Sequence, residues 1–256
     1  MVIYRTSRKI NDAQQIGTSM GEIRLGCSGW SYDHWRGLFY EDVDPRHYLE
    51  QYAKVFDCVE VNMTFYRFPT VKVLSSWYQR TPGGFLFAVK INRSITHRKR
   101  LQGISSLLVN FVDVCYSLSD KLGPLLVQFP PNFSKDTERL EMFLSLLSDT
   151  RVAFEFRNKS WFDDDVFRLL KSYNAALVMI GSQFEKNYTI YTDFAYIRWH
   201  GRGGQLDNYA YDEIDYWADR IRTISKNADV YGFWNNDSYA YAPKNCLELL
   251  QKLKSK

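Results

Sequence analysis

The stretch "VAFEFR", residues 152–157, alternates between two kinds of side chain. Phe154 and Phe156 share one face of an extended strand, and Glu155 and Arg157 share the other, because successive side chains of a strand point to opposite sides. In a parallel barrel the outer face of each strand packs on helices, and the inner face opens at the carboxyl end. The stretch therefore predicts a barrel strand with a polar carboxyl end.

Similar runs recur at intervals of roughly 20 to 40 residues, about the length of a βα unit. There are eight in all, and the other seven are "IRLGCSG" (23–29), "CVEVN" (58–62), "FLFAVKI" (85–91), "PLLVQFP" (124–130), "AALVMI" (175–180), "AYIRWHG" (195–201) and "VYGFWNN" (230–236). Helical patterns separate most of them, at 44–56, 70–80, 107–122, 136–148, 163–173, 211–224 and 246–254. The sixth connection, 181–194, is too short and too mixed for a helix. Because no GxGxxG follows the first run, we expect an α/β fold with a single, somewhat irregular (β/α)8 TIM barrel, rather than an open doubly wound sheet.

Composition and length favour one domain without membrane spans. The chain has 256 residues and no internal linker, so we assign residues 23–256 to the barrel and expect residues 1–22 to be a poorly ordered or loosely docked extension, with Met20 as an alternative start. No run approaches the roughly 18 apolar residues of a membrane helix, and no signal peptide is present. Four scattered cysteines without a CxxC pair indicate reduced thiols and a cytoplasmic protein. The net charge of +4 permits an anionic ligand but is weak for a dedicated nucleic-acid binder.

TIM-barrel sites lie at the carboxyl ends of the strands, so the polar residues at these ends are the candidates. Strand alternation places on the inner face Glu60, Asn62, Lys90, Gln128, Glu155, Arg157, Arg198 and His200. The end of "YGFWNND" (231–237) adds Asn235, Asn236 and Asp237, although the alternation there is ambiguous. Burying so many charges is poor design for stability, which favours a ligand site over an ion network that merely plugs the barrel.

Lys90 is the strongest single candidate for catalysis. A lysine that ends an apolar strand is partly desolvated, so it can bind an anion, act as a base or form a Schiff base, unless it is paired with Glu60 or Glu155. Glu155 between cationic neighbours would stay ionised and serve as a general base, and His200 would move protons. Glu60 and Asp237 complete the catalytic candidates.

The remaining candidates would bind the ligand. Arg157 and Arg198 would clamp a phosphate or carboxylate, and His97 would reach the mouth. Hydroxyl groups would be recognised by Asn62, Gln128, Asn235 and Asn236. Rings would stack on Trp30, Tyr32, Tyr66 and Trp161, unless these aromatic residues belong to the core.

Three cations against two carboxylates leave the predicted mouth positively charged. We therefore expect an enzyme, a hydrolase or isomerase, that acts on an anionic polyhydroxylated ligand: a sugar phosphate, a nucleotide or a nucleic-acid fragment. Two alternatives stay open. One is a non-catalytic nucleic-acid-binding protein, and the other is a neutral-sugar glycosidase that uses Glu60 and Glu155 as its carboxylate pair.

No cofactor is expected. A zinc cluster needs many His, Asp and Glu ligands, and the chain has four histidines. A single Mg²⁺ or Mn²⁺ held by Glu60, Glu155, His200 or Asp237 is less favoured, because Lys90 and two arginines would repel a cation.

Seven motifs in order resemble those of the YecE-like family of TIM-barrel proteins, a domain of unknown function that bears the number 72 in that series. They are "GCSGWSYDHWRGLFY" (26–40), "EVNMTFYRFP" (60–69), "FAVKINRSITHRKRL" (87–101), "LGPLLVQFPPNF" (122–133), "AFEFRNKSW" (153–161), "YIRWHG" (196–201) and "FWNND" (233–237). The resemblance runs from about Ile23 to the carboxyl terminus and implies a TIM barrel, but it implies no activity. Trp234 departs from the family pattern, which more often has Phe before the Asn pair. A likeness to endonuclease-IV-like and sugar-isomerase barrels is one of fold alone.

Overall fold

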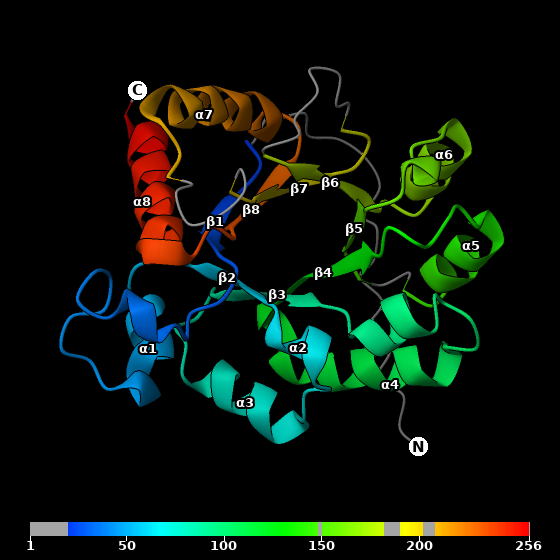
Figure 1. Ribbon diagram of the computed structural model, residues 1–256, viewed down its shortest axis with the longest axis horizontal. Helices are drawn as coiled ribbons and strands as arrows, with labels where there is room; N and C mark the ends of the chain where they lie inside the picture. The colour runs from blue at the N-terminus through cyan, green and yellow to red at the C-terminus, as the bar shows by residue number, and fades with distance from the viewer. Residues whose placement is uncertain (1–19, 148–149, 182–189, 202–207, 256) are drawn as a thin grey trace, which may run out of the picture.

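The computed structural model describes residues 20–147, 150–181, 190–201 and 208–255, and it contains one eight-stranded parallel sheet. The strands are β1 Ile23–Cys27, β2 Cys58–Val61, β3 Leu86–Lys90, β4 Leu122–Phe129, β5 Val152–Phe156, β6 Ala176–Ile180, β7 Phe194–Trp199 and β8 Asp229–Trp234. Their order in the sheet is β1-β8-β7-β6-β5-β4-β3-β2, and the sheet curls so that β1 comes back beside β2 (Figure 1). The predicted (β/α)8 TIM barrel is confirmed.

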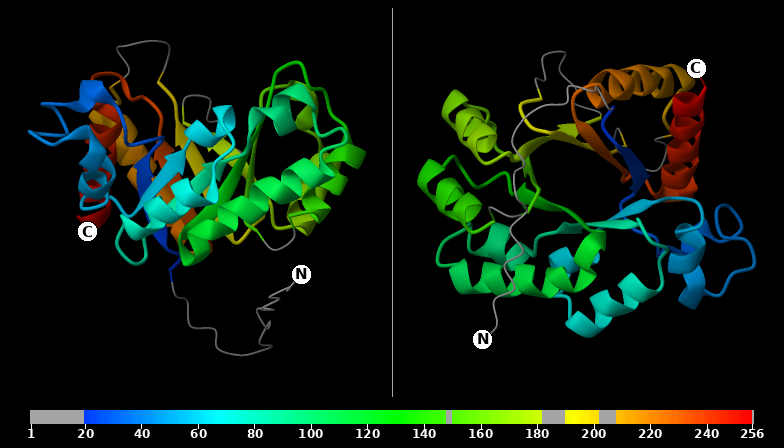
Figure 2. Two further views of the ribbon diagram at one scale, coloured as in Figure 1. Left: turned by 90° about the horizontal axis from the view of Figure 1, so that it is seen from below. Right: turned by 180° about the vertical axis from the view of Figure 1, so that it is seen from behind.

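Helices surround the barrel on its outside (Figures 1 and 2). They are α1 Tyr48–Tyr52, α2 Met63–Tyr66, α3 Val71–Gln79, α4 Ser105–Cys115, α5 Thr137–Ser145, α6 Asp164–Ser172, α7 Tyr211–Ser225 and α8 Tyr241–Lys254. The side chains of Thr70, Asp136 and Asp163 accept backbone N–H groups at the starts of α3, α5 and α6, which is why these helices begin where the sequence predicts. None of the described helices is both long and apolar enough to span a bilayer.

Three sequence predictions need comment. The short helix α2 is not predicted, and α8 begins at Tyr241 rather than at residue 246. The connection between β6 and β7 has no helix in its described residues, and residues 182–189 lie outside them. Most of the predicted extension, residues 1–19, also lies outside the described residues, whereas the N–H of Gly21 already donates to the carbonyl of Ser225 at 2.6 Å.

Two apolar layers form the core, as strand alternation requires. The outer layer fills the space between sheet and helices, and the inner layer is a belt inside the barrel. Six members of the belt are each followed, two residues later on the same strand face, by a polar residue. These pairs are Cys58 and Glu60, Ala88 and Lys90, Leu126 and Gln128, Ala153 and Glu155, Tyr196 and Arg198, and Phe233 and Asn235. The belt therefore supports a polar layer at the carboxyl end of the barrel.

A tyrosine hydroxyl closes the seam between β1 and β2, which share no ladder of backbone hydrogen bonds. The Tyr52 hydroxyl accepts from the Cys27 N–H at 2.7 Å and donates to the Cys58 carbonyl at 3.0 Å. The lack of a side chain at Gly26 allows the strands to approach closely, since a Cβ at this position would lie 2.2 Å from the Cys58 oxygen. The Tyr52 hydroxyl therefore satisfies both the Cys27 N–H and the Cys58 carbonyl, neither of which is left without a hydrogen bond.

Candidate functional site

An ion triad forms the floor of the barrel mouth. The Arg198 guanidinium on β7 donates from Nη2 to Glu60 Oε1 at 2.8 Å and from Nη1 to Glu155 Oε2 at 2.5 Å. The side chains of both carboxylates are 0% exposed, and that of Arg198 is 2% exposed. One arginine thus links the carboxyl ends of β2 and β5 across the barrel. The carboxylates in turn hold the pKa of Arg198 above its ordinary value against the lowering effect of burial.

Glu60 is surrounded by donors. Ser28 Oγ lies 2.7 Å and Asn62 Nδ2 3.3 Å from Oε1, and the Tyr196 hydroxyl donates to Oε2 at 2.8 Å. Burial acts to raise the pKa of Glu60, but Arg198 and the hydrogen bonds from Arg198 and Ser28 hold it below its ordinary value. Glu60 is therefore a buried carboxylate whose ionised form its neighbours stabilise.

Glu155 is equally occupied. Gln128 Nε2 donates to Oε1 at 2.7 Å, Arg157 pairs with the same oxygen, and His200 Nε2 lies 3.9 Å from Oε2. Burial again acts to raise the pKa, yet Arg198, His200 and Arg157 hold the pKa of Glu155 well below its ordinary value. A carboxylate with this many donors is a weak proton acceptor, which argues against the predicted role of Glu155 as general base.

Lys90 differs from every other charged group in the mouth. It ends β3 and is only 8% exposed, and its ammonium lies 4.4 Å from the centroid of the Phe65 ring. Within the described residues its Nζ makes neither a hydrogen bond nor an ion pair, because both nearby carboxylates are engaged by arginines. Burial, with a further contribution from Arg198, lowers the pKa of Lys90 to about 8. The predicted alternative, a salt bridge from Lys90 to a carboxylate, is wrong.

His97 lies against the edge of the same Phe65 ring, with centroids 4.9 Å apart. Its Nδ1 is 2.9 Å from the Thr96 hydroxyl. Burial, followed by the charges of Lys90 and Arg93, lowers the pKa of His97 to about 4. At neutral pH this imidazole is uncharged and, like Glu155, a weak proton acceptor, but it has one N–H and one bare ring nitrogen, so it can relay a proton beside Lys90 by giving one up as it takes one.

His200 bridges the floor and β8. Its Nε2 lies 3.3 Å from Arg198 Nη1, and its Nδ1 lies 2.9 Å from Asn235 Nδ2. The Tyr209 hydroxyl donates to its carbonyl at 2.7 Å. The His200 side chain is 21% exposed, so it remains accessible while Arg198 and Asn235 fix the orientation of its ring.

One predicted stacking residue is in the core instead, and this prediction is wrong. Trp161 is 0% exposed, stacks on Phe156 with centroids 5.0 Å apart, and donates Nε1–H to the Phe133 carbonyl at 2.6 Å. Trp30 packs edge-on against Trp77 of α3, at 5.1 Å, but is only partly buried, so its stacking role stays a prediction.

The four other predicted residues at the rim of the mouth, which are Asn236, Asp237, Tyr32 and Tyr66, have different surroundings. Asn236 donates from Nδ2 to Asn245 Oδ1 on α8 at 3.0 Å, and its role in binding stays a prediction. Asp237 offers its backbone carbonyl to His34 and Trp35, outside the carboxylate cluster.

The tyrosines Tyr32 and Tyr66 also differ from each other. The Tyr32 hydroxyl donates to the Ser28 carbonyl at 2.7 Å, next to Glu60. Tyr66 is 64% exposed and its ring lies 5.6 Å from the Arg93 guanidinium carbon, so it alone of the predicted stacking residues presents an open ring.

Sequence reasoning missed three contributors to the mouth. Tyr196 precedes Arg198 by two residues and shares its face, so alternation alone could have found it. Ser28 directly follows β1. Phe65, beneath Lys90, lies in the unpredicted helix α2, and no periodic signal marks it.

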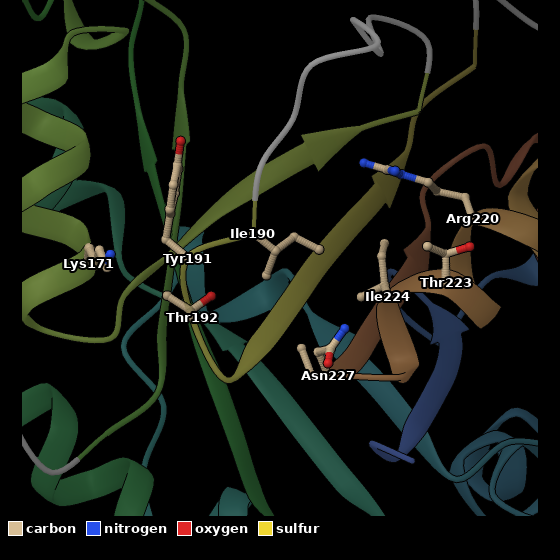
Figure 3. A pocket seen from close by; sticks show the side chains of 9 residues that line it. Lys171, Ile190, Tyr191, Thr192, Arg220, Thr223, Ile224 and Asn227 are labelled. Atoms are coloured by element: carbon tan, nitrogen blue, oxygen red, sulfur yellow. The ribbon is translucent and has the colours of Figure 1, made fainter. Parts of the chain in front are cut away.

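A pocket of about 570 Å³ lies at the opposite end of the barrel, between α6, the residues before β7 and the end of α7 (Figure 3). Lys171, Tyr191 and Asn227 are among its lining residues. This end carries the amino termini of the strands, which in TIM barrels serves stability rather than chemistry. In the part of the chain that the structure describes, no group of three or more His, Cys, Asp or Glu side chains could hold a metal ion.

Comparison with known proteins gives a consistent picture. The family model described as "Protein of unknown function DUF72" matches residues 24–256. The UPF0759 protein YunF of Bacillus subtilis strain 168 is 25% identical over 90% of this chain and 94% of its own length. The UPF0759 protein YecE of Escherichia coli K12 is 30% identical over 55% of this chain and 50% of its own length.

Solved structures agree. The crystal structure of a DUF72 family protein from Thermotoga maritima MSB8 has a TM-score of 0.78 and 26% identity, and the match covers 91% of this chain and 100% of that one. A DUF72 family protein from Enterococcus faecalis V583, 23% identical over 91% of this chain and 96% of that one, has the same fold, with a TM-score of 0.78.

Proposed function

The chain belongs to the DUF72 family, and we propose that the mouth of its barrel binds an anionic, polyhydroxylated small molecule, a sugar phosphate or a nucleotide, and acts on it as an enzyme. One observation carries the proposal. The cations Lys90, Arg157 and Arg198 face two carboxylates, and Lys90 is the cation left without an anionic partner among the described residues. Buried charges are normally paired, so a ligand anion is the natural partner for Lys90.

The floor also offers acceptors for hydroxyl groups. Asn62 Oδ1 is buried and has no hydrogen-bond partner within the described residues. Gln128 uses its Nε2 on Glu155, which leaves its own oxygen for a ligand hydroxyl. An orphaned buried oxygen costs about 1–3 kcal/mol, and a hydroxyl donor from a ligand would recover that cost.

The proposal assigns each group a role. Lys90 supplies the unpaired positive charge that attracts the ligand, Arg157 holds its anionic group, and Asn62, Gln128 and Asn235 recognise hydroxyls. His97 and His200 move protons, because both imidazoles are partly exposed. Glu60 and Glu155 position Arg198 and do not take part in proton transfer.

The same geometry disfavours a glycosidase. Retaining and inverting enzymes both need one carboxyl group that carries a proton, with its pKa raised. The pKa values of Glu60 and Glu155 are both held below their ordinary value. A carboxylate pair locked on one arginine cannot supply the general acid.

A second candidate is the binding of single-stranded nucleic acid at the rim. Tyr66 is exposed with Arg93 against its ring, and Arg98 and Lys99 are exposed nearby in sequence. Open aromatic rings and basic side chains together are typical of such surfaces. If this candidate is right, an oligonucleotide binds with a strong salt dependence, and Tyr66→Ala weakens it more than Lys90→Met does.

The proposed function is tested by calorimetric titration with a panel of sugar phosphates and nucleotides. The wild-type chain is expected to bind at least one of them, and Lys90→Met to weaken that binding by about tenfold or more, the loss of one charge-assisted contact. Lys226→Met is the matched control, because it removes the same charge from an exposed lysine. Lys226 lies at the end of α7, at the far end of the barrel. A wild-type chain that binds no member of the panel, or a Lys90→Met variant that binds like the control, contradicts the proposal.

A further inference from the structure

We infer that Lys90 forms a covalent imine with an aldehyde or ketone group of its ligand. This inference rests on the proposed function and names the reactive group of the anionic ligand: the carbonyl of a sugar phosphate in its open-chain form. The argument rests on what surrounds the Lys90 ammonium, on a second buried lysine that serves as comparison, and on a neighbouring imidazole.

The Lys90 backbone is held in place, but its nitrogen has no hydrogen bond or ion pair to any residue that the structure describes. The backbone is pinned, since the Thr64 hydroxyl donates to the Lys90 carbonyl at 2.7 Å and the next residue bonds to β4. The ammonium contacts the face of Phe65 at 4.4 Å, and no described carboxylate lies within ion-pair distance of it. A nucleophilic amine needs this arrangement, because an ion pair would have to be broken before attack on a carbonyl.

Lys121 shows what a structural buried lysine looks like in the same chain. It is 4% exposed, comparable with Lys90, but its Nζ donates to the carbonyls of Tyr78 and Thr81, both at 2.6 Å, and to the Thr81 hydroxyl at 3.1 Å. All three of its donors are used, so its charge is satisfied by the fold. Lys90 is similarly buried, at 8% exposed, and makes none of these bonds to the residues that the structure describes.

Groups from several strands set the reactivity of Lys90. Glu60 on β2, Glu155 and Arg157 at the end of β5, and Arg198 on β7 all act on it. Burial and the two arginines outweigh the two carboxylates, and the pKa falls to about 8. Roughly half of the Lys90 side chains are then free amine near pH 8, compared with under about 1% for an ordinary lysine.

The step is balanced without any co-reactant. The Lys90 nitrogen attacks the carbonyl carbon, the carbonyl oxygen takes a proton, and the resulting carbinolamine loses water to give the C=N bond. His97, uncharged and on the same Phe65 ring, can carry the proton from nitrogen to oxygen. Addition of water reverses the reaction and releases the carbonyl compound.

Reductive trapping tests the inference. The full chain is incubated at pH 8 with glyceraldehyde 3-phosphate or dihydroxyacetone phosphate, reduced with borohydride, and analysed by intact mass and peptide mapping. We expect one adduct per chain at Lys90, formed at least about tenfold faster than adducts at exposed Lys226, with Lys121 unmodified. Glyceraldehyde without phosphate should label Lys90 more slowly, because it lacks the anion.

Two variants separate the outcomes. Lys90→Arg keeps the positive charge but has no nucleophilic amine, and Lys90→Met has neither, so both should form no adduct in the mouth. Calorimetric binding of a sugar phosphate without trapping at Lys90 overturns the imine and leaves the proposed function standing. Trapping at Lys90 at the rate of exposed lysines, equal with and without phosphate, overturns the imine as well. Absence of any binding to the phosphate panel contradicts the proposed function itself.

Discussion

Replacement of Arg198 by methionine is the sharpest test of the ion triad. The change keeps a long side chain but removes the only cation that contacts Glu60 within the described residues, and it removes one of the two arginines on Glu155. Both carboxylate side chains are 0% exposed, so water cannot take over the lost interactions. The variant must therefore either bury uncompensated charge or take up protons.

The expected loss of stability is large. Removal of one partner of a buried ion pair costs about 3–5 kcal/mol, and because Arg198 serves two carboxylates we expect about 5 kcal/mol. The free energy of unfolding of a domain of this kind is about 5–15 kcal/mol, so we expect the variant to be marginally stable or unfolded at room temperature. The triple variant Glu60→Gln, Glu155→Gln, Arg198→Met contains no triad charge, and we expect its stability within about 2 kcal/mol of wild type.

The pH dependence gives a second readout. In the wild type the pKa values of both glutamates are lowered in the folded state, so their contribution to stability is present above the unfolded value of about 4.3 and is lost as the pH falls through the folded values. In Arg198→Met the contributions of Arg198 that oppose burial at Glu60 are lost, while the Ser28 hydrogen bond and the Lys90 charge remain. Folding therefore favours the protonated carboxyl group more than it does in the wild type, and acidification costs the variant less stability. The difference from wild type should thus be larger at about pH 7 than at about pH 5.

Urea unfolding followed by tryptophan fluorescence measures both effects. The reasoning is refuted if Arg198→Met loses less than about 1 kcal/mol, if the triple variant is no more stable than the single one, or if the deficit grows on acidification. Any of these results would mean that the triad is not the charged, desolvated floor that its geometry describes.

Three further predictions concern the seam, the mouth and the lower end of the barrel. Tyr52→Phe should cost about 1–3 kcal/mol in urea unfolding, because it orphans two buried backbone groups, whereas the exposed Tyr116→Phe should cost almost nothing; equal costs would contradict the seam. His97→Gln should reduce the loss of stability between pH 6.5 and about 4, since a folded pKa below the ordinary 6.5 makes the unfolded chain bind the proton first; an unchanged pH profile would exclude this. Arg151→Met should lower the unfolding free energy by about 1–3 kcal/mol, as Arg151 pairs with Asp229 at 2.7 Å and donates to the Tyr231 hydroxyl; a change within 0.5 kcal/mol would show that the cluster is dispensable.

The sequence predicts the inner face of the strands well, because alternation is a local rule. Glu60, Lys90, Glu155 and Arg198 each lie two residues beyond an apolar residue of the inner belt, and the structure brings all four together. The rule holds as long as the backbone remains extended. It therefore identifies strand residues without any knowledge of the partner strands.

Beyond the strand ends the rule fails. Asn235 and Asn236 follow β8 directly and are adjacent in sequence. Asn235 nevertheless contacts His200, whereas Asn236 contacts Asn245 on α8. Trp30 and Trp161 lie in loops whose course depends on the helices they pack against. Pairing is also not local: which cation takes which carboxylate is decided by the reach of side chains across the barrel, and the sequence cannot show that Arg198 would engage both.

This pairing changes where chemistry can occur. From sequence, Glu155 is the natural base, since it is a carboxylate beside cations. In the structure the oxygens of Glu155 already accept hydrogen bonds from Gln128 and Arg198, and Glu60 likewise accepts from Arg198. A group that must accept a proton or attack a carbon needs an unoccupied lone pair. In the described mouth the amine of Lys90 and the imidazole of His97 meet this requirement, because neither is bound to the triad. The carboxylates of the triad thus have their hydrogen bonds filled and form a charged floor. The reactive groups are then the nitrogen atoms of Lys90 and His97.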